Sequence, residues 1–552
     1  DDLTYLLDHP PANPDCSVFK MSAPTEGERL RKEMKQRIAD YRKNAHALVD
    51  YVADYYEMLA DASTDIPVLS RVSPGFITQN PKFTQPPPAE GVSFESVLKE
   101  VEEVIKPGMT HWQHPHFMAY FPSATSLESQ LGDMLAQAFN AVGFSWITSP
   151  AMTELEMVTL DWIAKAMDLP EKFLSSGAGG GCIQMTASDA CFVVILGARE
   201  RAVRSEAFLP YPKKTLENGH ANGHAKEASQ VLEQEEDEAK RTDFSKLVAY
   251  VTDQAHSALA KSAKCAGVRC RVLPTRGGAE GGFLGMDVDA LLEEMRKDRD
   301  AGRIPCFVNA TVGTTSTNAV DSMSTLAAAV RKEFPSVWLH CDAAYAGAFN
   351  LLPECREHFK GLEDFDSFNF NPHKQMLVGF DCSVLYIGRK EDVVSVFQAT
   401  PEFLKNKHTS SGTVIDYKDW QVGLGRRFRS LKIFFVWKLL GRAKVEEYLR
   451  RCLSSAKVFS DLITSDPSKS FEVTHPVKFG LVCFRLRDAS DEVQLKLLER
   501  LNHSPRNLFL IHTKVEGRVV LRAAFNTPLG GEEQAHTLWE ALKEEMVSLS
   551  KS

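Results

Sequence analysis

Apolar residues recur every three or four positions between Glu26 and Ala60, and charged residues occupy the other side of this stretch. This spacing predicts a helix over residues 26–60. A second helix is expected over 94–105, after a proline-dense connector at 81–88. Neither apolar face has an obvious partner nearby in the sequence. We therefore predict that residues 26–123 form a helical arm that packs on a second subunit, with packing on its own chain as the alternative.

Alternating strands and helices are predicted between Gly177 and Gly388. The expected strands are Leu247–Val251, Cys306–Ala310, Val337–Cys341, Asp366–Phe370 and Ser383–Ile387. The expected helices are Ala187–Arg204, Asp287–Asp300 and Thr325–Phe334. Such alternation favours an α/β fold with a mostly parallel central sheet covered on both faces. We assign residues 124–431 to this large domain.

The remaining segments have different patterns. Beyond residue 431, helices are followed by strand-like runs at Leu481–Arg485 and Val519–Ala523, so 432–552 is predicted to be a small α+β domain. Residues 1–25 are expected to be a disordered leader. Residues 213–240 repeat Asn-Gly-His and then become acidic, which predicts a flexible surface insertion. Histidines in the repeat could bind a metal, but the composition favours the insertion, and we predict no metal site.

Composition narrows the classes of partner. The net charge is -9 and no basic stripe follows a predicted helix, so we expect neither nucleic acid nor a membrane surface as a partner. The longest apolar runs are too short to span a bilayer. The first residues lack the basic-then-apolar order of a signal peptide. The 11 cysteines include no Cys-x-x-Cys pair, which indicates reduced thiols in a cytoplasmic protein.

Candidate chemical groups stand where predicted strands end. Lys374 follows a short strand that stops at Pro372, and it is either a surface residue or a buried amine that reacts with carbonyls. Asp342 ends another strand, where it would face a ligand or cap a helix. His256 follows a third strand and could equally be a core histidine. The glycines at 179–181 lead to Thr186-Ala187-Ser188 at a helix start, which suits a phosphate or a plain cap.

Together these residues match the needs of one cofactor. Pyridoxal phosphate requires an anion site for its phosphate, a carboxylate for its pyridinium nitrogen, a flat group over its ring and a lysine for its aldehyde. The hydroxyl-rich helix start, Asp342, His256 and Lys374 supply these four groups. The sequence therefore predicts pyridoxal 5'-phosphate as the cofactor.

The sequence also resembles a known family from about Glu26 to the C-terminus. The blocks that carry the resemblance are 111–115 (HWQHP), 119–123 (AYFPS), 143–146 (GFSW), 253–257 (DQAHS), 342–347 (DAAYAG), 369–374 (NFNPHK) and 425–432 (GRRFRSLK). They are similar to the aromatic L-amino acid decarboxylases of the group II pyridoxal-phosphate family. The resemblance implies a type I pyridoxal-phosphate-dependent transferase fold and an obligate homodimer with active sites shared between subunits.

The resemblance also assigns roles to individual residues. It implies that Lys374 carries the cofactor, His256 stacks on its ring and Asp342 pairs with its nitrogen. The other residues that the resemblance implies are Ala187, Ser188 and Asn371, which would hold the phosphate, and Thr315, Ala344 and His373, which would lie beside the cofactor. The expected aromatic pocket consists of Tyr120, Pro122 and Ser123, completed by Val142 and Phe144 from the partner subunit, with Gly425 giving room for larger rings.

Two positions depart from the family pattern. Met185 stands where relatives usually carry glycine, and we expect it to crowd the phosphate turn. The family's loop tyrosine, in a Pro-x-Tyr-Leu pattern, is replaced by Phe403 in Pro401-Glu402-Phe403-Leu404. Phenylalanine offers no proton, so the sequence resembles the aromatic acetaldehyde synthase branch, which decarboxylates and oxidatively deaminates aromatic L-amino acids with dioxygen.

The expected products are therefore an aromatic acetaldehyde, carbon dioxide, ammonia and hydrogen peroxide. An ordinary decarboxylase that makes the arylalkylamine is the alternative. An aminotransferase and a non-enzymatic homologue are further alternatives, and the intact Lys374, Asp342 and His256 argue against the second of these. Phe, Tyr, Dopa and Trp all remain open as the substrate.

Overall fold

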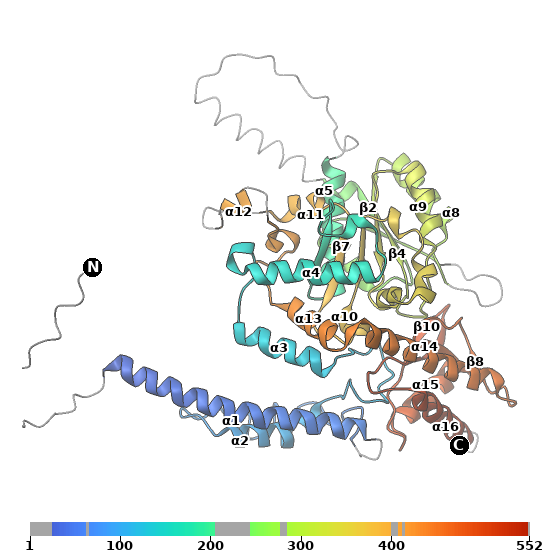
Figure 1. The fold of residues 1–552 in the computed structure, drawn as a ribbon. Helices are drawn as coiled ribbons and strands as arrows, with labels where there is room; N and C mark the ends of the chain where they lie inside the picture. The colour runs from blue at the N-terminus through green and yellow to red at the C-terminus, as the bar shows by residue number, and fades with distance from the viewer. Residues whose placement is uncertain are drawn as a thin grey trace, which may run out of the picture.

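The computed structural model describes residues 25–61, 66–204, 243–275, 284–398, 404, 407–410 and 414–549. A large α/β body carries a long helical arm at one end of the sequence and a smaller α+β unit at the other (Figure 1). The predicted leader at 1–25 lies outside this part of the chain apart from Thr25, and so does the insertion at 213–240.

A seven-stranded mixed sheet forms the centre of the body. Its strand order is β1-β7-β6-β5-β4-β2-β3, with only β7 antiparallel to its neighbours. The strands are β1 (Gly180–Gln184), β2 (Leu247–Thr252), β3 (Arg269–Leu273), β4 (Ile304–Thr311), β5 (Trp338–Asp342), β6 (Ser367–Phe370) and β7 (Ser383–Ile387). The mostly parallel sheet expected from the sequence is confirmed.

Helices cover both faces of this sheet, as the continuous apolar strands require. Side chains alternate between two cores: Leu247 and Ala249 belong to one, Val248 and Tyr250 to the other. The first core contains residues of α5 (Ala187–Arg204), α7 (Ser257–Cys265) and α11 (Glu391–Phe397). The second contains residues of α4 (Pro150–Ala166), α8 (Val288–Asp300), α9 (Met323–Glu333) and α13 (Arg429–Leu439).

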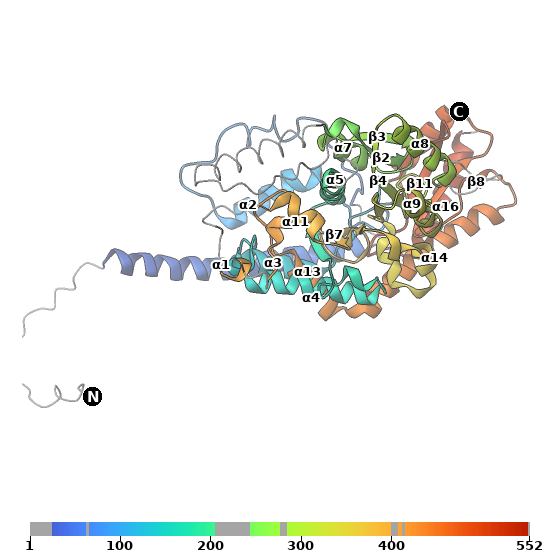
Figure 2. The same ribbon diagram turned by 90° about the horizontal axis from the view of Figure 1, so that it is seen from above.

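The N-terminal arm consists of α1 (Glu26–Ala60) and the shorter α2 (Phe94–Glu100), which continues into a π-helical turn at Val101–Ile105. Thr25 and Glu28 form a capping box that starts α1. In α1 only Leu59 is buried, and the helix extends well beyond the body (Figure 2). Apolar side chains on it, including Leu30, Met34 and Ile38, stay exposed.

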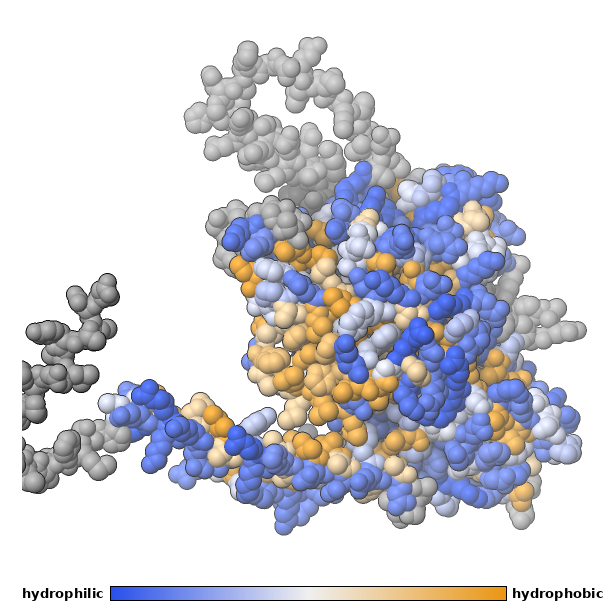
Figure 3. All heavy atoms as spheres, in the orientation of Figure 1, coloured by the Kyte–Doolittle hydropathy of each residue, from blue (hydrophilic) through white to orange (hydrophobic). Residues whose placement is uncertain are grey.

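An apolar surface lies on the body next to this arm (Figure 3). It includes exposed side chains of α3 (Leu127–Phe139), among them Leu131, Met134 and Phe139, which is 59% exposed. A monomer rarely leaves so many large apolar groups uncovered along adjacent helices. The arm and this surface together suit contact with another protein chain.

The C-terminal unit is a four-stranded antiparallel sheet packed on helices. Its strand order is β10-β11-β9-β8. The strands are β8 (Phe471–Val473), β9 (Leu481–Leu486), β10 (Ile511–Val515) and β11 (Arg518–Ala524). The helices are α14 (Gly441–Ser465), α15 (Asp491–Asn502) and α16 (Glu532–Leu549). The expected domain boundary at 431/432 falls inside α13, whose Ile433 and Val436 belong to the core of the large body.

Two strands at the edges of the central sheet were not expected. The first is β1, which begins with Gly180 and Gly181 and pairs closely with β7. Gly179 allows this close approach, since a Cβ there would lie 1.8 Å from the Ile387 carbonyl oxygen. Strand β3 was also missed, because its sequence Arg-Cys-Arg-Val-Leu carries polar residues at an exposed sheet edge. Among the described residues, no helix has the length and apolar character of a membrane span.

A buried ion pair joins α4, β1 and the segment before α13. Arg426 donates to both carboxylate oxygens of Glu156 at 2.7 and 2.9 Å, and each side chain is 4% exposed. Glu156 also accepts from the Ile183 amide at 2.8 Å, and Arg426 donates to the Ile183 carbonyl. All of these groups are removed from water, so the loss of one would leave a buried charge or polar group without its partner.

We expect Glu156→Ala to destabilise the protein strongly, because it leaves the Arg426 charge buried without a partner. Breaking such a pair typically costs about 3–5 kcal/mol. Chemical denaturation followed by fluorescence measures the effect. Glu447→Ala is the matched control, because its ion pair with Lys444 is exposed and should contribute little. Equal midpoints for the two variants would contradict the role of the buried pair.

Candidate functional site

The expected site residues come from strand ends that meet at one edge of the sheet. Strands β1, β2, β4, β5 and β6 run in the same direction, so their carboxyl ends lie together. Asp342 is the last residue of β5, and the other expected cofactor residues follow the ends of these strands. In chain order these are Ala187 and Ser188 after β1, His256 after β2, Thr315 after β4, Ala344 after β5, and Asn371, His373 and Lys374 after β6. This is the edge where open α/β sheets bind ligands.

Lys374 lies on the short helix α10 (Pro372–Gln375), directly after β6. Desolvation by burial lowers the pKa of its amine, and the negative charge of Asp342 opposes part of this effect. The amine lies 5.9 Å from the centre of the Phe121 ring. A lowered pKa increases the fraction of unprotonated amine, which is the form that attacks a carbonyl carbon.

Asp342 and His256 share this environment. Asp342 is 4% exposed, and one of its oxygens accepts from the Ala344 amide at 3.0 Å. Among the described residues, its other oxygen accepts no hydrogen bond, so it is available to a ring N–H. His256 caps α7, because its Nδ1 accepts from the Ala258 amide at 3.2 Å. Burial lowers the pKa of His256, opposed by Asp342 and reinforced by Lys374, so it is a neutral ring at neutral pH.

The start of α5 has free donors for an anion. Thr186 and Asp189 cap this helix: the Thr186 amide and hydroxyl both donate to Asp189, at 3.0 and 2.6 Å. Within the described structure, the amides of Ala187 and Ser188 donate to no protein group. Two unpaired amides at a helix N-terminus favour a phosphate. The Met185 side chain is 50% exposed, and its backbone φ is not positive.

Asn371 supplies a further donor. Burial lowers the pKa of His373 to about 3, so the ring is neutral. Its Nδ1 accepts from the Cys382 amide at 2.9 Å, which places the ring proton on Nε2. That nitrogen faces the Asn371 side chain at 3.2 Å, so Asn371 must present its oxygen to His373. The Asn371 amide nitrogen then takes the buried position that has no protein partner, where it can donate to a phosphate.

The structure adds three residues that the sequence did not single out. The Phe121 ring stacks on Tyr345 with centroids 3.6 Å apart, and the Tyr345 hydroxyl accepts from the Gly480 amide of the small unit. Arg522 comes from β11 and lies 5.2 Å from the Phe121 ring centre. It is 2% exposed, its Nε donates to the Ser316 carbonyl at 3.2 Å, and one of its terminal nitrogens has no protein partner among the described residues. A lone arginine within the apolar run Val519–Ala524 was the signal that could have identified it.

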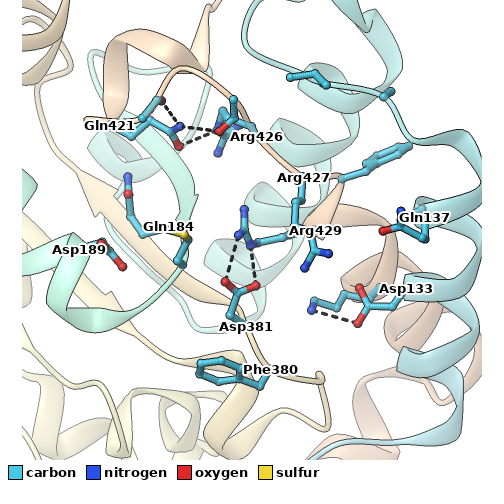
Figure 4. Close-up of a pocket in the computed structure, with 18 of the residues that line it drawn as sticks. Asp133, Gln137, Gln184, Asp189, Phe380, Asp381, Gln421, Arg426, Arg427 and Arg429 are labelled. Carbon is cyan, nitrogen blue, oxygen red and sulfur yellow. Dashed lines mark hydrogen bonds and ion pairs between the residues drawn. The ribbon is translucent and has the colours of Figure 1, made fainter. Parts of the chain in front are cut away.

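A cavity of about 680 Å³ lies between α3, the start of α5 and the segment that precedes α13 (Figure 4). Val142, Gly425 and Met185 line it. A Cβ added to Gly425 would contact the Val142 Cγ1 atom at 3.7 Å, so these two pocket candidates are neighbours. Ion pairs border the cavity, including the pair between Arg429 and Asp381 at 2.9 Å.

The other pocket candidates lie in two separate places. Tyr120 adopts a φ of 54°, is 48% exposed and stacks on Trp112, while Pro122 is buried and Ser123 half-buried beside it. Phe144 is half-buried, and its carbonyl accepts from the Lys418 amide at 3.0 Å. Lys374 and the Tyr120 segment flank Phe121, whereas Val142 and Gly425 line the cavity, whose lining does not include Lys374. Phe403 lies outside the described residues.

Comparisons with known proteins agree with this geometry. Residues 78–207 and 223–487 match the model of the pyridoxal-dependent decarboxylase conserved domain. Phenylacetaldehyde synthase from Arabidopsis thaliana is 40% identical, over 91% of this chain and 95% of its own length. Aromatic-L-amino-acid decarboxylase from Sus scrofa is also 40% identical, over 92% of this chain and 96% of its own.

A solved structure extends the likeness to three dimensions. The crystal structure of Oryza sativa TDC with PLP and tryptamine superposes with a TM-score of 0.81 at 37% identity, covering 93% of this chain and 98% of that one. The type I fold expected from the sequence is therefore confirmed. The chain belongs to the pyridoxal-dependent decarboxylases, and it is a pyridoxal-phosphate enzyme of the aromatic amino acid decarboxylase family.

Proposed function

We propose that this enzyme converts aromatic L-amino acids to aromatic acetaldehydes by decarboxylation coupled to oxidative deamination. The observation that carries this proposal is Phe403, which stands where the resembled family has a loop tyrosine. The likeness to a phenylacetaldehyde synthase supports it, although other relatives are named as decarboxylases. Ordinary decarboxylation to the arylalkylamine is the alternative function.

The residues of the site fit pyridoxal phosphate. The Ala187 and Ser188 amides and the Asn371 side chain would hold its phosphate, Asp342 its ring nitrogen and Lys374 its aldehyde carbon. When bound, the cofactor accepts the electron pair that remains at the substrate's α-carbon after carbon dioxide leaves. His256 would cover one face of the ring, with Thr315, Ala344 and His373 beside it.

Arg522 is suited to the substrate's carboxylate. Its guanidinium is buried beside the Phe121 ring, which the Lys374 amine also approaches. Burial lowers the pKa of this guanidinium, and no ion pair with a described carboxylate offsets that effect. A substrate carboxylate would supply that compensation on binding. Phe121, which lies between Lys374, Arg522 and Tyr345, would shield this group from water.

The fate of the α-carbon depends on the available acid. A positioned general acid typically accelerates proton transfer by about 10²–10⁴-fold, and a phenylalanine side chain has no proton to give. Dioxygen then competes for the two electrons and becomes hydrogen peroxide. Hydrolysis of the resulting C=N bond releases ammonia and the aldehyde. One amino acid, one dioxygen and one water thus yield one aldehyde, one carbon dioxide, one ammonia and one hydrogen peroxide.

We also propose that the active site is completed by a second subunit. Tyr120, Pro122 and Ser123 would form one wall of the aromatic pocket, while Val142, Phe144 and Gly425 would enter the partner's site. The exposed apolar surfaces of α1 and α3 support this assembly. Gly425 leaves space beside Val142, which suits indole as well as phenyl rings, so Phe, Tyr, Dopa and Trp are all candidate substrates.

Lys374→Ala should abolish the visible absorbance of the lysine-bound cofactor near neutral pH, because the variant has no amine to bond with the aldehyde. Absorbance spectroscopy of the purified protein measures this. Lys172→Ala is the control, since burial also lowers the pKa of the Lys172 amine but it lies outside the site. A visible band of parental intensity in Lys374→Ala would show that the cofactor assignment is wrong.

Phe403 should determine the product. We expect the parent enzyme to release about one peroxide per carbon dioxide, and Phe403→Tyr to shift the product towards the amine by restoring a proton donor. Peroxide, carbon dioxide and amine are measured with each of Phe, Tyr, Dopa and Trp. Phe403→Leu is the control, since it changes the side chain without adding an acid. Amine as the main product of the parent would establish the alternative function, and release of no carbon dioxide would indicate an aminotransferase.

Shared sites predict complementation between two inactive variants. Lys374→Ala lacks the reactive amine, and Phe144→Ala lacks the aromatic side chain that would enter the partner's site. Co-expression of the two should restore about a quarter of the parental activity, because about half of the dimers are mixed and each mixed dimer contains one intact site of two. The activity of homodimers of each variant expressed alone gives the background. Absence of recovery in a purified mixed dimer would mean that Phe144 serves its own chain.

A further inference from the structure

The segment from Val142 to Trp146, which contains two of the proposed pocket residues, is held to the chain around Asp416. The Lys418 amide donates to the Phe144 carbonyl at 3.0 Å, and the Gly143 amide donates to the Arg426 carbonyl at 3.3 Å. The Trp146 amide donates to Asp416 Oδ1 at 2.8 Å. Three hydrogen bonds from residues 416–426 therefore fix this segment, and the bond to Asp416 is charge-assisted.

Asp416 also binds a second element. Its Oδ2 accepts from the hydroxyl of Thr409 at 2.6 Å, on the short helix α12 (Lys407–Ser410). The neighbouring His408 ring packs on the Trp146 indole with centroids 4.8 Å apart. The indole itself donates to Glu154 at the start of α4, at 2.8 Å. Asp416 is only 6% exposed, so both of its bonds are protected from water.

We propose that Asp416 is a positioning residue that joins α12 to the Val142–Trp146 segment and thereby holds Phe144 in place for the substrate pocket. One carboxylate oxygen accepts from Thr409 and the other accepts from the Trp146 amide. A change at Thr409 is therefore transmitted to Trp146, which lies 263 positions earlier in the sequence. α12 begins four residues after Phe403 in the sequence. The Val142–Trp146 segment and α12 are thus both bound by Asp416. The expected effect on substrate binding rests on the proposed function. The hydrogen bonds by which Asp416 joins α12 to the Val142–Trp146 segment do not.

Thr409→Val tests this link with little change in shape, because it replaces the hydroxyl by a methyl group. A hydrogen bond to a charged group contributes enough to change a local opening equilibrium about tenfold or more. We expect amide hydrogen exchange in the peptide 142–148 to accelerate by about tenfold, together with exchange in 407–410. Thr409→Ser keeps the hydroxyl and should exchange like the parent. The peptide 511–515 in β10 is the internal control.

Enzyme kinetics provide the second readout. Because Phe144 belongs to the proposed substrate wall, Thr409→Val and Asp416→Asn should raise KM for the aromatic substrate several-fold, leaving kcat within about twofold and cofactor affinity unchanged. Unchanged exchange at 142–148 in Thr409→Val would overturn the proposal. Equal defects in Thr409→Ser and Thr409→Val would also overturn it, because the hydroxyl would not be the link.

Accelerated exchange with an unchanged KM would overturn the positioning role and leave a purely structural contact. If the parent enzyme converts none of the four aromatic amino acids, the proposed function fails instead. The exchange experiment still decides the physical link in that case, since it needs no substrate. The two failures are therefore distinguishable.

Discussion

The structure depends on placing a lysine amine at the carboxyl edge of the sheet without the water that would keep it protonated. Burial lowers the pKa of Lys374, and the Asp342 carboxylate limits that effect. The same Asp342 charge opposes the lowering of the His256 pKa. Six of the seven strands end at one edge of the sheet, which brings these three side chains together because each stands at or shortly after the end of its strand. Rigid strands then fix distances that loops alone would not.

Much of this arrangement could be predicted from the sequence because it depends on local patterns. The strands that became β2, β4, β5, β6 and β7 are short apolar runs buried on both faces, and their ends are marked by polar or proline residues. Asp342 ends such a run, and His256 and Lys374 lie a few residues beyond the ends of two others. Helix α5 was placed at its observed bounds because its start carries a cap and its apolar spacing is regular.

Other features could not be predicted because they are set by tertiary contacts. β1 was not expected from its glycine-rich start, because it pairs with β7 far along the chain, and glycine at position 179 is needed for the close approach of the two backbones. Arg522 looks like one polar residue in an apolar strand, and its place beside Phe121 depends on how the small unit packs on the large one. The bonds of Asp416 to Trp146 and Thr409 likewise join residues distant in sequence.

The separation of the pocket candidates follows from the same geometry. A sheet edge can present the cofactor groups from one chain, but the residues that would select an aromatic ring lie on surfaces that point elsewhere. Val142 and Gly425 line a cavity beside α3, whose large apolar side chains are exposed. Exposed apolar surface next to pocket residues is costly in an isolated chain and favourable when a second copy covers it. Dimer formation and completion of the active site would then use the same surface. A chain that fails to associate would therefore also fail to recognise its substrate.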